Sequence, residues 1–483
     1  MPFKDLREFI TALDKEDEVK RIEDEVDWNL EAGAMTRCSC EAGLSAPFFQ
    51  KVKDYPEGYR LFGEVLGNHR RIAIAMEMDP NVSPRTLIEE YLKRKASPIK
   101  PVLVKEGPCK ENIHIGDEVD LLEFPVPIVH KGDGGRYIGT WHLTICKDLN
   151  SDWINWGTYR HMLHNKNTIG LQAGPPTHVR RAMQSWEDRG KSMEIAIAIG
   201  VEPISTLCAV SPIPYGVSEA DIVGGIRGEP IELIKCETVD LEVPSTAEIV
   251  IEGEVGFQET MIEGPFGEYT GYMGGHKEPR PVIHVKAVTH RKDPILTMAN
   301  EGLPVSCTHA THSITRSAEF WDVLKSQGIP ATGVYEFTEA CTLLVVVAIR
   351  SGLARADDVA HAIWASRVGV STPWVVVVED DVDPFNLGQV LHALVSKCHP
   401  YRGITRLEHA RGLALHPFLS RHEQRYLQGA RAYFDCTWPP DWDPADVPQK
   451  CSFTNMYPVE IQRKALDKWR KVGGITDESF ETL

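Results

Sequence analysis

The sequence lacks long apolar runs, paired cysteine motifs and an excess of positive charge. In its 483 residues, no stretch approaches the roughly 18 consecutive apolar residues that a membrane-spanning helix needs. Residues 1–13 show an amphipathic pattern instead of the apolar core of a signal peptide. The formal net charge of −17 argues against nucleic-acid and anionic-membrane surfaces. We therefore expect a cytoplasmic protein with no nucleic-acid or membrane partner.

The cysteines and short motifs exclude further classes. The 11 cysteines are scattered and form no CxxC pair, which disfavours a zinc ribbon and indicates reduced thiols. The chain also has no P-loop, no GxGxxG sequence after a strand pattern and no GxSxG elbow. These absences argue against several common nucleotide-dependent enzymes and hydrolases.

Length and pattern divide the chain into parts, because 483 residues exceed what one hydrophobic core supports. Residues 1–110 are expected to form a small α+β domain. It has a helix over 3–13, β-like runs at 59–62 and 71–75, and a helix from Pro84 to about residue 94 capped by Ser83. Residues 95–108 have three prolines and no apolar period, which is typical of a linker.

Residues 111–310 have the pattern of a β domain, a barrel or a sandwich. Strands are expected within 136–145 and at 154–162, 194–201, 248–255 and 282–289. One helix, at 178–189, interrupts them.

Residues 311–440 are expected to form an α/β domain. Continuous apolar runs at 343–349 and 374–378 predict buried parallel strands, and 354–367 between them has helical spacing. A further helix is expected at 386–397. Residues 441–483 form a tail ending in a helix at 459–472, which could dock on a neighbouring subunit or on its own chain. The expected fold class is therefore α/β in the broad sense that helices and strands are mixed, and the chain taken as a whole is α+β.

The most informative stretch is residues 261–271, which place Glu263 and Glu268 on a backbone interrupted by three glycines and a proline. Such a backbone is not helical and is a poor strand interior, so a loop is expected. Paired carboxylates on a fixed loop suit acid–base chemistry. The plainer alternative is a surface turn with two solvated glutamates.

Three polar residues far apart in the sequence form a second candidate site. Asn155, His178 and Glu219 together would offer amide oxygen, imidazole and carboxylate, a ligand set that suits Mn²⁺ or Mg²⁺ better than structural zinc. Each alone is more often structural, and their spacing cannot assemble them. Arg160 offers a positive fork for a carboxylate or an anionic substrate, or is a surface arginine.

Several separated motifs, taken in order, resemble those of the UbiD-like family of reversible decarboxylases, which use prenylated FMN. They are Gly-Thr-Trp at 139–141, Asn-Trp-Gly-Thr-Tyr-Arg at 155–160, Thr-His at 177–178, Gly-Val-Ser-Glu at 216–219, Glu-Gly-Pro-Phe-Gly-Glu at 263–268, and residues 379–386 followed by Lys397. The resemblance covers nearly the whole chain. It implies an N-terminal α+β domain, a central split β-barrel like that of flavin reductases, and a C-terminal α/β domain.

The resemblance also implies a role for each matching position. Asn155, His178 and Glu219 match the ligands of a divalent metal, usually Mn²⁺, that bridges to the cofactor phosphate. A nearby K⁺ site involves the positions of Trp156, Glu219, Cys208, Ala209 and Ser211, where Ser211 replaces a frequent methionine. Arg160, Glu263 and Glu268 match the catalytic Glu–Arg–Glu set. The prenylated flavin contacts implied by the family fall at Thr140, Trp141, Gly157, Thr158, Tyr159, Thr177, Pro212 and Lys397, with Thr177 in place of the usual glutamine.

The implied reaction is loss of CO₂ from a small aromatic or heteroaromatic acid, with hydroxybenzoates favoured. Glu268 is expected to donate the replacing proton while Arg160 pairs with Glu263. His309 and His312 could bond a substrate ring substituent or be structural. A flavin prenyltransferase must supply the cofactor, and a homo-oligomer, dimer or hexamer, is expected. The alternatives are a flavin-binding electron-transfer protein and a subunit of an aromatic carboxylase complex.

Overall fold

The computed structural model describes residues 2–151, 153–175 and 177–473. The chain forms two compact units, Met1–Cys436 and Thr437–Leu483. The first unit contains all of the sheets described below, and the second contains short helices.

The N-terminal part of the first unit is a small sheet with helices. Its helices are α1 (Leu6–Lys15), α2 (Glu31–Glu41), α3 (His69–Ala75) and α4 (Pro84–Lys95). The sheet has the order β1-β2-β3-β18, formed by β1 (Val19–Ile22), β2 (Ala46–Phe49), β3 (Arg60–Gly63) and β18 (Ile295–Met298). Ser83 caps α4, as the sequence predicts.

The β-like interpretation of residues 71–75 is wrong, because they form the end of α3. Asn68 caps this helix by accepting a hydrogen bond from the Arg71 backbone N–H. Residues 71–75 are all buried, so the helix shows no amphipathic period. A short apolar run of this kind does not distinguish a buried helix from a strand.

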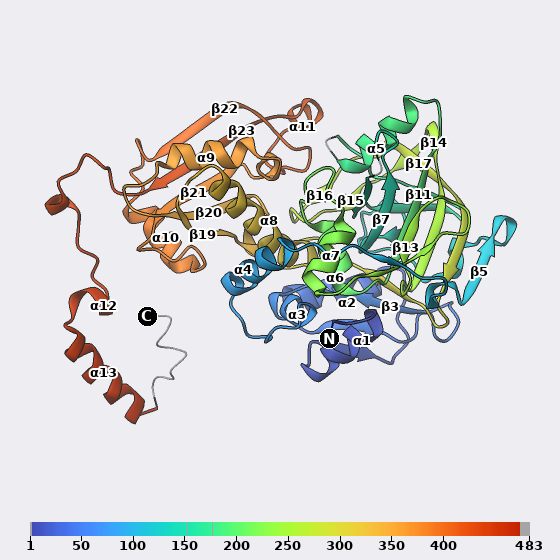
Figure 1. The fold of residues 1–483 in the computed structure, drawn as a ribbon, viewed down its shortest axis with the longest axis horizontal. Helices are drawn as coiled ribbons and strands as arrows, with labels where there is room; N and C mark the ends of the chain where they lie inside the picture. The colour runs from blue at the N-terminus through green and yellow to red at the C-terminus, as the bar shows by residue number, and fades with distance from the viewer. Residues whose placement is uncertain (1, 152, 176, 474–483) are drawn as a thin grey trace. The chain divides into compact units, whose positions relative to one another are not determined.

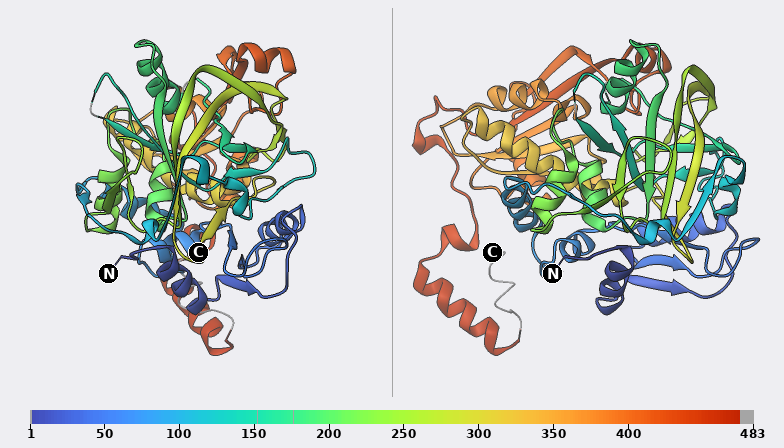
Figure 2. Two further views of the ribbon diagram at one scale, coloured as in Figure 1. Left: turned by 90° about the vertical axis from the view of Figure 1, so that its right-hand side faces the viewer. Right: turned by 45° about the vertical axis from the view of Figure 1, so that its right-hand side comes forward.

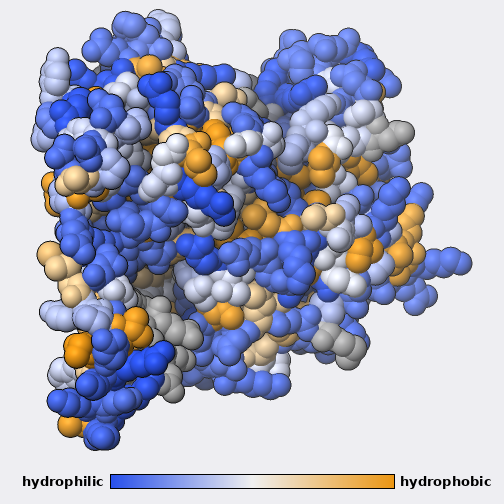
Figure 3. Space-filling model, turned by 60° about the vertical axis from the view of Figure 1, so that its left-hand side comes forward, coloured by the Kyte–Doolittle hydropathy of each residue, from blue (hydrophilic) through white to orange (hydrophobic). Residues whose placement is uncertain are grey.

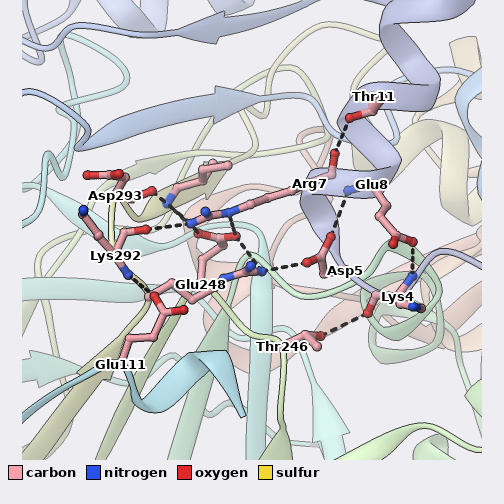
Figure 4. Close-up of polar contacts among 12 residues, drawn as sticks. Lys4, Asp5, Arg7, Glu8, Thr11, Glu111, Thr246, Glu248, Lys292 and Asp293 are labelled. Carbon is pink, nitrogen blue, oxygen red and sulfur yellow. Dashed lines mark hydrogen bonds and ion pairs between the residues drawn. The ribbon is translucent and has the colours of Figure 1, made fainter.

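A buried ion-pair cluster joins α1 to the middle of the chain (Figure 4). Arg7 of α1 makes two hydrogen bonds of 2.8 Å to the carboxylate of Glu248. Arg291 bonds both Asp5, at 2.9 Å, and Glu248, at 3.3 Å. Because the Glu248 side chain is fully buried, its charge depends on these two arginines.

The middle part is built on a nine-stranded sheet that curls into a half-barrel (Figures 1 and 2). The strand order is β6-β9-β10-β17-β14-β11-β7-β8, and β5 pairs with β17. The strands are β5 (Asn112–Ile115), β6 (Tyr137–Gly139), β7 (His142–Lys147), β8 (Ile154–Gly157), β9 (His161–Asn165), β10 (Thr168–Gly170), β11 (Met193–Ile199), β14 (Ile249–Glu263) and β17 (Glu278–His290). The predicted single strand at 154–162 is therefore two strands, separated by residues 158–160.

The half-barrel part has more helices than the single one predicted. Helix α5 (His178–Glu187) confirms that prediction, but α6 (Pro203–Val210) and α7 (Glu219–Arg227) were missed. Helix α6 is buried almost throughout, which removes the amphipathic signal. The expected linker contains β4 (Val102–Leu103), which joins β12 (Glu232–Lys235) and β13 (Glu242–Pro244) in a small sheet.

The C-terminal part of the first unit is α/β, as predicted. Its sheet has the order β19-β20-β21-β23-β22, formed by β19 (Ala331–Glu336), β20 (Leu344–Ile349), β21 (Trp374–Glu379), β22 (Ile404–Arg411) and β23 (Gln428–Cys436). Strands β20 and β21 are parallel and joined through α9 (Ala356–Ala365), which confirms the βαβ prediction. The other helices are α8 (Cys307–Ser326), α10 (Leu387–Ser396) and α11 (Arg421–Tyr426). The sequence interpretation missed the 20-residue α8.

The second unit contains α12 (Phe453–Met456) and α13 (Val459–Lys471). Helix α13 confirms the predicted terminal helix, and Leu466 is its buried residue. Figure 3 shows a largely hydrophilic surface with apolar side chains in small separate groups. Within the described residues, no helix has the length and apolar character that crossing a membrane requires. All 11 cysteines are free, as predicted.

Candidate functional site

The residues Arg160, Glu263 and Glu268 meet at one buried point. Arg160 donates from Nε to Glu263 Oε1 at 2.8 Å, and its Nη1 forms an ion pair with Glu268. Glu263 is 1% exposed and Glu268 is 9% exposed, so neither is a solvated surface glutamate. The plainer alternative for residues 261–271 is therefore wrong.

Different elements bring the three side chains together. Arg160 lies in the break between β8 and β9, and Glu263 is the last residue of β14. The strand thus continues through residues 261–263, where the sequence predicted a loop. Glu268 follows the short β15 (Phe266–Gly267), which pairs with β16 (Met273–Gly274).

Two glycines allow this turn. Gly264 has φ +84°, in the left-handed region that favours glycine. A Cβ on Gly274 would lie 2.2 Å from Cγ of Glu268. The glycine at 274 therefore leaves the space that the Glu268 side chain occupies.

Burial sets the electrostatics of this group. Burial, which removes the carboxyl from water, raises the pKa of Glu268 to about 7. The Arg160 cation acts in the opposite direction, and the negative charges of Glu301, Glu263 and Asp133 raise this pKa further. One guanidinium is shared between two carboxylates, so it does not compensate both. Burial alone would lower the pKa of Arg160. The attraction of the Glu268 and Glu263 carboxylates is stronger than this effect, so the pKa of Arg160 is raised. The arrangement is a fixed cation beside a carboxyl that can hold a proton near neutral pH.

The residues Asn155, His178 and Glu219 form a second buried group. His178 Nδ1 donates to Asn155 Oδ1 at 3.2 Å, and Glu219 Oε2 accepts the backbone N–H of Trp156 at 3.0 Å. Asn155 lies on β8, whereas His178 and Glu219 are the first residues of α5 and α7. The fold therefore brings together three positions that their sequence spacing leaves separate.

This group has the properties of an incomplete coordination shell. Because Nδ1 of His178 carries the proton, Nε2 keeps its lone pair, and this buried atom has no hydrogen-bond partner among the described residues. Burial lowers the pKa of His178 to about 4 and raises that of Glu219 to about 8. A neutral imidazole, an amide oxygen and an undercompensated carboxylate fit a divalent cation.

Several positions with predicted flavin contacts lie on, or next to, the elements that carry these two groups: Gly157 is on β8 and Thr177 is the N-cap of α5. Trp141 is buried and its indole Nε1 has no partner among the described residues. The Thr140 hydroxyl accepts a hydrogen bond from the Ala299 backbone N–H, and the Thr158 hydroxyl donates one to the His142 carbonyl. The Thr177 hydroxyl donates to the Gly174 carbonyl and accepts a backbone N–H at the N-terminus of α5. Gly157 is closely approached by the Tyr159 ring, and Pro212 follows the end of α6.

The predicted K⁺ positions lie between β8 and α6, which pack together. Trp156 is on β8, Cys208 and Ala209 are in α6, and Ser211 is its C-terminal cap. The Ser211 hydroxyl donates to the Leu207 carbonyl at 2.6 Å. Lys397 lies elsewhere, at the end of α10, where its ammonium bonds Glu379 at 2.9 Å and Asp381 at 2.7 Å.

The two candidate substrate histidines lie on α8 and differ in their contacts. His309 Nδ1 accepts from the Ser306 N–H, and its Nε2 donates to the Tyr269 carbonyl at 2.6 Å, directly beside Glu268. His312 donates from Nε2 to the Val210 carbonyl at 3.2 Å, which leaves Nδ1 buried without a described partner. Burial lowers the pKa of His312 to about 3, so it is neutral.

Sequence reasoning missed the residues that brace the glutamate turn. Asp133 accepts the backbone N–H of Gly267 at 3.1 Å, and His130 bonds Asn300 Oδ1 at 2.8 Å. The Arg160 guanidinium lies 5.4 Å from the centroid of the Phe266 ring. The sequence signal for Asp133 is its place directly before the glycine pair at 134–135, where a polar residue in a turn can bond a neighbouring backbone.

Family models match three consecutive regions of the chain. Residues 10–91 match the 3-octaprenyl-4-hydroxybenzoate carboxy-lyase N-terminal domain, residues 100–304 its Rift-related domain, and residues 309–436 its C-terminal domain. These matches and the site define a carboxy-lyase.

Relatives agree with this class over the full length. A pyrrole-2-carboxylic acid decarboxylase of Pseudomonas aeruginosa is 32% identical, covering 97% of this chain and 98% of the relative. The chain belongs to the UbiD family. A closed-form vanillic acid decarboxylase of Sedimentibacter hydroxybenzoicus has a TM-score of 0.88 at 27% identity, covering 98% of this chain and 100% of that one. An evolved dimeric form of HmfF from Pelotomaculum thermopropionicum, in complex with prFMN, has a TM-score of 0.78 at 29% identity, covering 92% and 97%.

Proposed function

We propose that the protein catalyses the non-oxidative, reversible decarboxylation of an aromatic or heteroaromatic carboxylic acid, with CO₂ as the second product. The observation that carries the proposal is the buried Glu263–Arg160–Glu268 group, in which one cation serves two carboxylates. A hydroxybenzoate-like acid is the favoured substrate. Nδ1 of His312, which has no hydrogen-bond partner in the described part of the chain, supports this preference, because it could accept a hydrogen bond from a phenol.

Prenylated FMN is the proposed cofactor, supported by the prFMN complex of the neighbouring structure. Asn155, His178 and Glu219 would hold Mn²⁺ or Mg²⁺ at the cofactor phosphate, and K⁺ would bind near Trp156 and the end of α6. When bound, the cofactor supplies the electron sink for the electron pair that departing CO₂ leaves on the substrate. Trp141 and residues 157–159 would line its site, and Lys397 would have to leave its present ion pairs to contribute.

The chain's own residues would then handle the carboxylate and the proton. Arg160 would orient the substrate carboxylate, with Glu263 fixing the guanidinium by the 2.8 Å hydrogen bond. Glu268 would donate the proton that replaces CO₂, because its raised pKa keeps it partly protonated near neutral pH. Its enclosure would exclude competing water.

The remaining expectations belong to the same proposal. The domains would be 1–110, 111–310 with a split β-barrel, 311–440 and the tail 441–483. A flavin prenyltransferase would supply the cofactor, and the protein would work in the cytoplasm as a homo-oligomer. HmfF, whose evolved form is dimeric, supports the expectation of an oligomer.

Mass spectrometry of the released ligand is the first test. The protein is co-expressed with a flavin prenyltransferase, supplied with Mn²⁺ and K⁺, and then screened against aromatic acids for CO₂ release. We expect prenylated FMN and release of CO₂ from at least one acid. Plain FMN with NAD(P)H-dependent reduction would instead support an electron-transfer protein. Activity that needs a second chain would support a carboxylase subunit.

A further inference from the structure

A cluster of metal-ligand side chains lies at the outer edge of the half-barrel, on elements that carry none of the proposed catalytic residues. His114 is on β5, Glu123 ends the 3-10 helix η3 (Leu121–Glu123), and His290 is the last residue of β17. One ligand atom from each lies within 4.8 Å of the others. In Figure 1, β5 lies at the opposite side of the half-barrel from α8.

Strand pairing explains why the two histidines share a face. Strands β5 and β17 are antiparallel, with His290 opposite Asn112 and Val288 opposite His114. The histidines are therefore diagonal neighbours on one face of the pair. Their rings are parallel, with centroids 5.5 Å apart.

The surroundings of His290 prepare it as a ligand. Its Nδ1 donates to the Arg291 carbonyl at 2.8 Å, which places the proton there and leaves a lone pair on Nε2. A hydrogen bond of this kind orients most metal-binding histidines in proteins. The Phe124 ring packs edge-on against His290 at 5.4 Å between centroids and shields one side.

Glu123 supplies the second, independent observation. Its Oε1 atom is buried and has no hydrogen-bond partner among the described residues. An unpaired buried carboxylate oxygen beside two imidazoles is costly unless a cation or a proton joins it.

We propose that His114, Glu123 and His290 bind a zinc-like transition-metal ion. Two imidazoles and a carboxylate form a common three-ligand zinc set, with water in the fourth position. Bonds of about 2.0–2.2 Å bring tetrahedral donors closer than the spacing seen here, so the side chains close around the ion. His114 and Glu123 are only partly buried, which leaves both room to rotate and a path for the ion.

The ion would tie an outer segment to the half-barrel. Residues 112–124 contain β5 and η3, and the strand to which β5 pairs within the described residues is β17, at its C-terminal end. One bound ion links the two ends of this segment to His290. The inferred role is to hold this segment against the half-barrel, at a position separate from the proposed metal position at Asn155, His178 and Glu219.

The test counts zinc ions on the full-length protein. Metal-free wild type and the variants His114→Ala and Glu123→Gln are equilibrated with Zn²⁺ alone, desalted and analysed by inductively coupled plasma mass spectrometry. Hydrogen–deuterium exchange of residues 112–124 is measured with and without Zn²⁺. The matched control is His284→Ala, which removes a histidine from β17 that pairs with exposed Glu259.

We expect wild type and His284→Ala to hold one more zinc ion per chain than either site variant. Zinc should slow exchange in residues 112–124 of wild type and of His284→Ala, but not in the site variants. Equal zinc content and equal protection in wild type and in both site variants would overturn the proposal. A loss of zinc in His284→Ala equal to that in the site variants would also overturn the proposal, because it would indicate non-specific binding by surface histidines. Circular dichroism verifies that each variant is folded, and the half-buried His114 is the mildest position to change.

Discussion

At the residue scale, the chemistry depends on one arginine placed between two buried carboxylates. Arg160 pairs with both Glu263 and Glu268, and burial disfavours the charge on Glu268. The consequence is a carboxyl at Glu268 whose pKa is raised to about 7. In water a glutamate titrates near pH 4.3, too low to hold a proton in neutral solution.

Replacing Glu268 by glutamine should remove the proton donor but keep the shape. We expect turnover to fall by about 100- to 10,000-fold, the usual contribution of a general acid. CO₂ release is measured together with cofactor content, which should stay unchanged. Full activity in Glu268→Gln with an intact cofactor would refute the assigned role.

The same carboxyl predicts a pH profile. Because Glu268 must be protonated to donate, decarboxylation should decline as pH rises above about 7, the value to which burial raises its pKa. The rate is measured from pH 5 to 9 at saturating substrate. A rate that increases steadily through this range would contradict a protonated Glu268.

His178 predicts a linked loss of metal and cofactor. His178→Ala removes the imidazole whose Nε2 has no partner among the residues that the structure describes, so Mn²⁺ and flavin should both be lost together with activity. Metal and flavin are quantified on the purified variant. His361→Ala, at an exposed position of α9, is the control. Inactive protein with full flavin occupancy would show that His178 does not anchor the cofactor.

At the element scale, the β15–β16 hairpin holds Glu268 between the half-barrel and α8. The ion pair to Arg160 links it to the half-barrel, and the hydrogen bond from His309 to the Tyr269 carbonyl links it to α8. The backbone N–H of Gly267, bound by Asp133, fixes a third point. Elements from three parts of the chain therefore position one side chain.

Gly274→Ala tests this positioning without changing a polar group. The added Cβ would lie 2.2 Å from Glu268 Cγ, so the glutamate must move. We expect turnover to drop at least tenfold while flavin content and melting temperature change little, because the site depends on placement at the ångström scale. Unchanged kinetics would mean that the hairpin adjusts and that Glu268 is not held by it.

Glu248 tests the joint between α1 and the half-barrel. Glu248→Gln removes the charge that faces Arg7 and Arg291, and we expect the free energy of unfolding to fall by about 3 kcal/mol. Urea titration measures it. Glu259→Gln, in an exposed pair with His284, should change stability little. Equal effects in the two variants would show that burial does not matter at this joint.

At the scale of the whole molecule, the N-terminal and half-barrel parts of the first unit share strands. Strand β18 follows the half-barrel in sequence but completes the N-terminal sheet beside β3. Strand β4, in the expected linker, pairs with β12. Backbone pairing therefore joins the α+β and half-barrel parts, whereas, within the described residues, the sheet of the α/β part contains only its own strands.

Helix α13 belongs to the second unit and exposes Val459, Ile461 and Trp469. Ending the chain after Pro458 should leave the melting of the first unit unchanged, because, in the part of the chain that the structure describes, its hydrophobic clusters contain no residue of this helix. If these apolar residues support a homo-oligomer, light scattering should show a smaller assembly. An unchanged mass would exclude that role.

Local pattern was sufficient for many elements. The capped helix at Pro84, the βαβ unit around α9 and the terminal helix were all predicted from periodicity and capping residues. It failed at α3, α6 and α8, because burial on most sides removes the polar face that produces a helical period. It also placed Glu263 in a loop, although β14 continues to that residue.

The sequence by itself determined the residue types available for chemistry, the reduced cysteines, the broad α+β character and, through ordered motifs, the family. Only the tertiary structure brought Asn155, His178 and Glu219 into one group and closed Arg160 onto Glu263 and Glu268. The physical reason is that these contacts depend on sheet register and helix placement across a hundred residues, which local propensity does not encode. Burial, and with it the raised pKa of Glu268, exists only once those distant elements have packed.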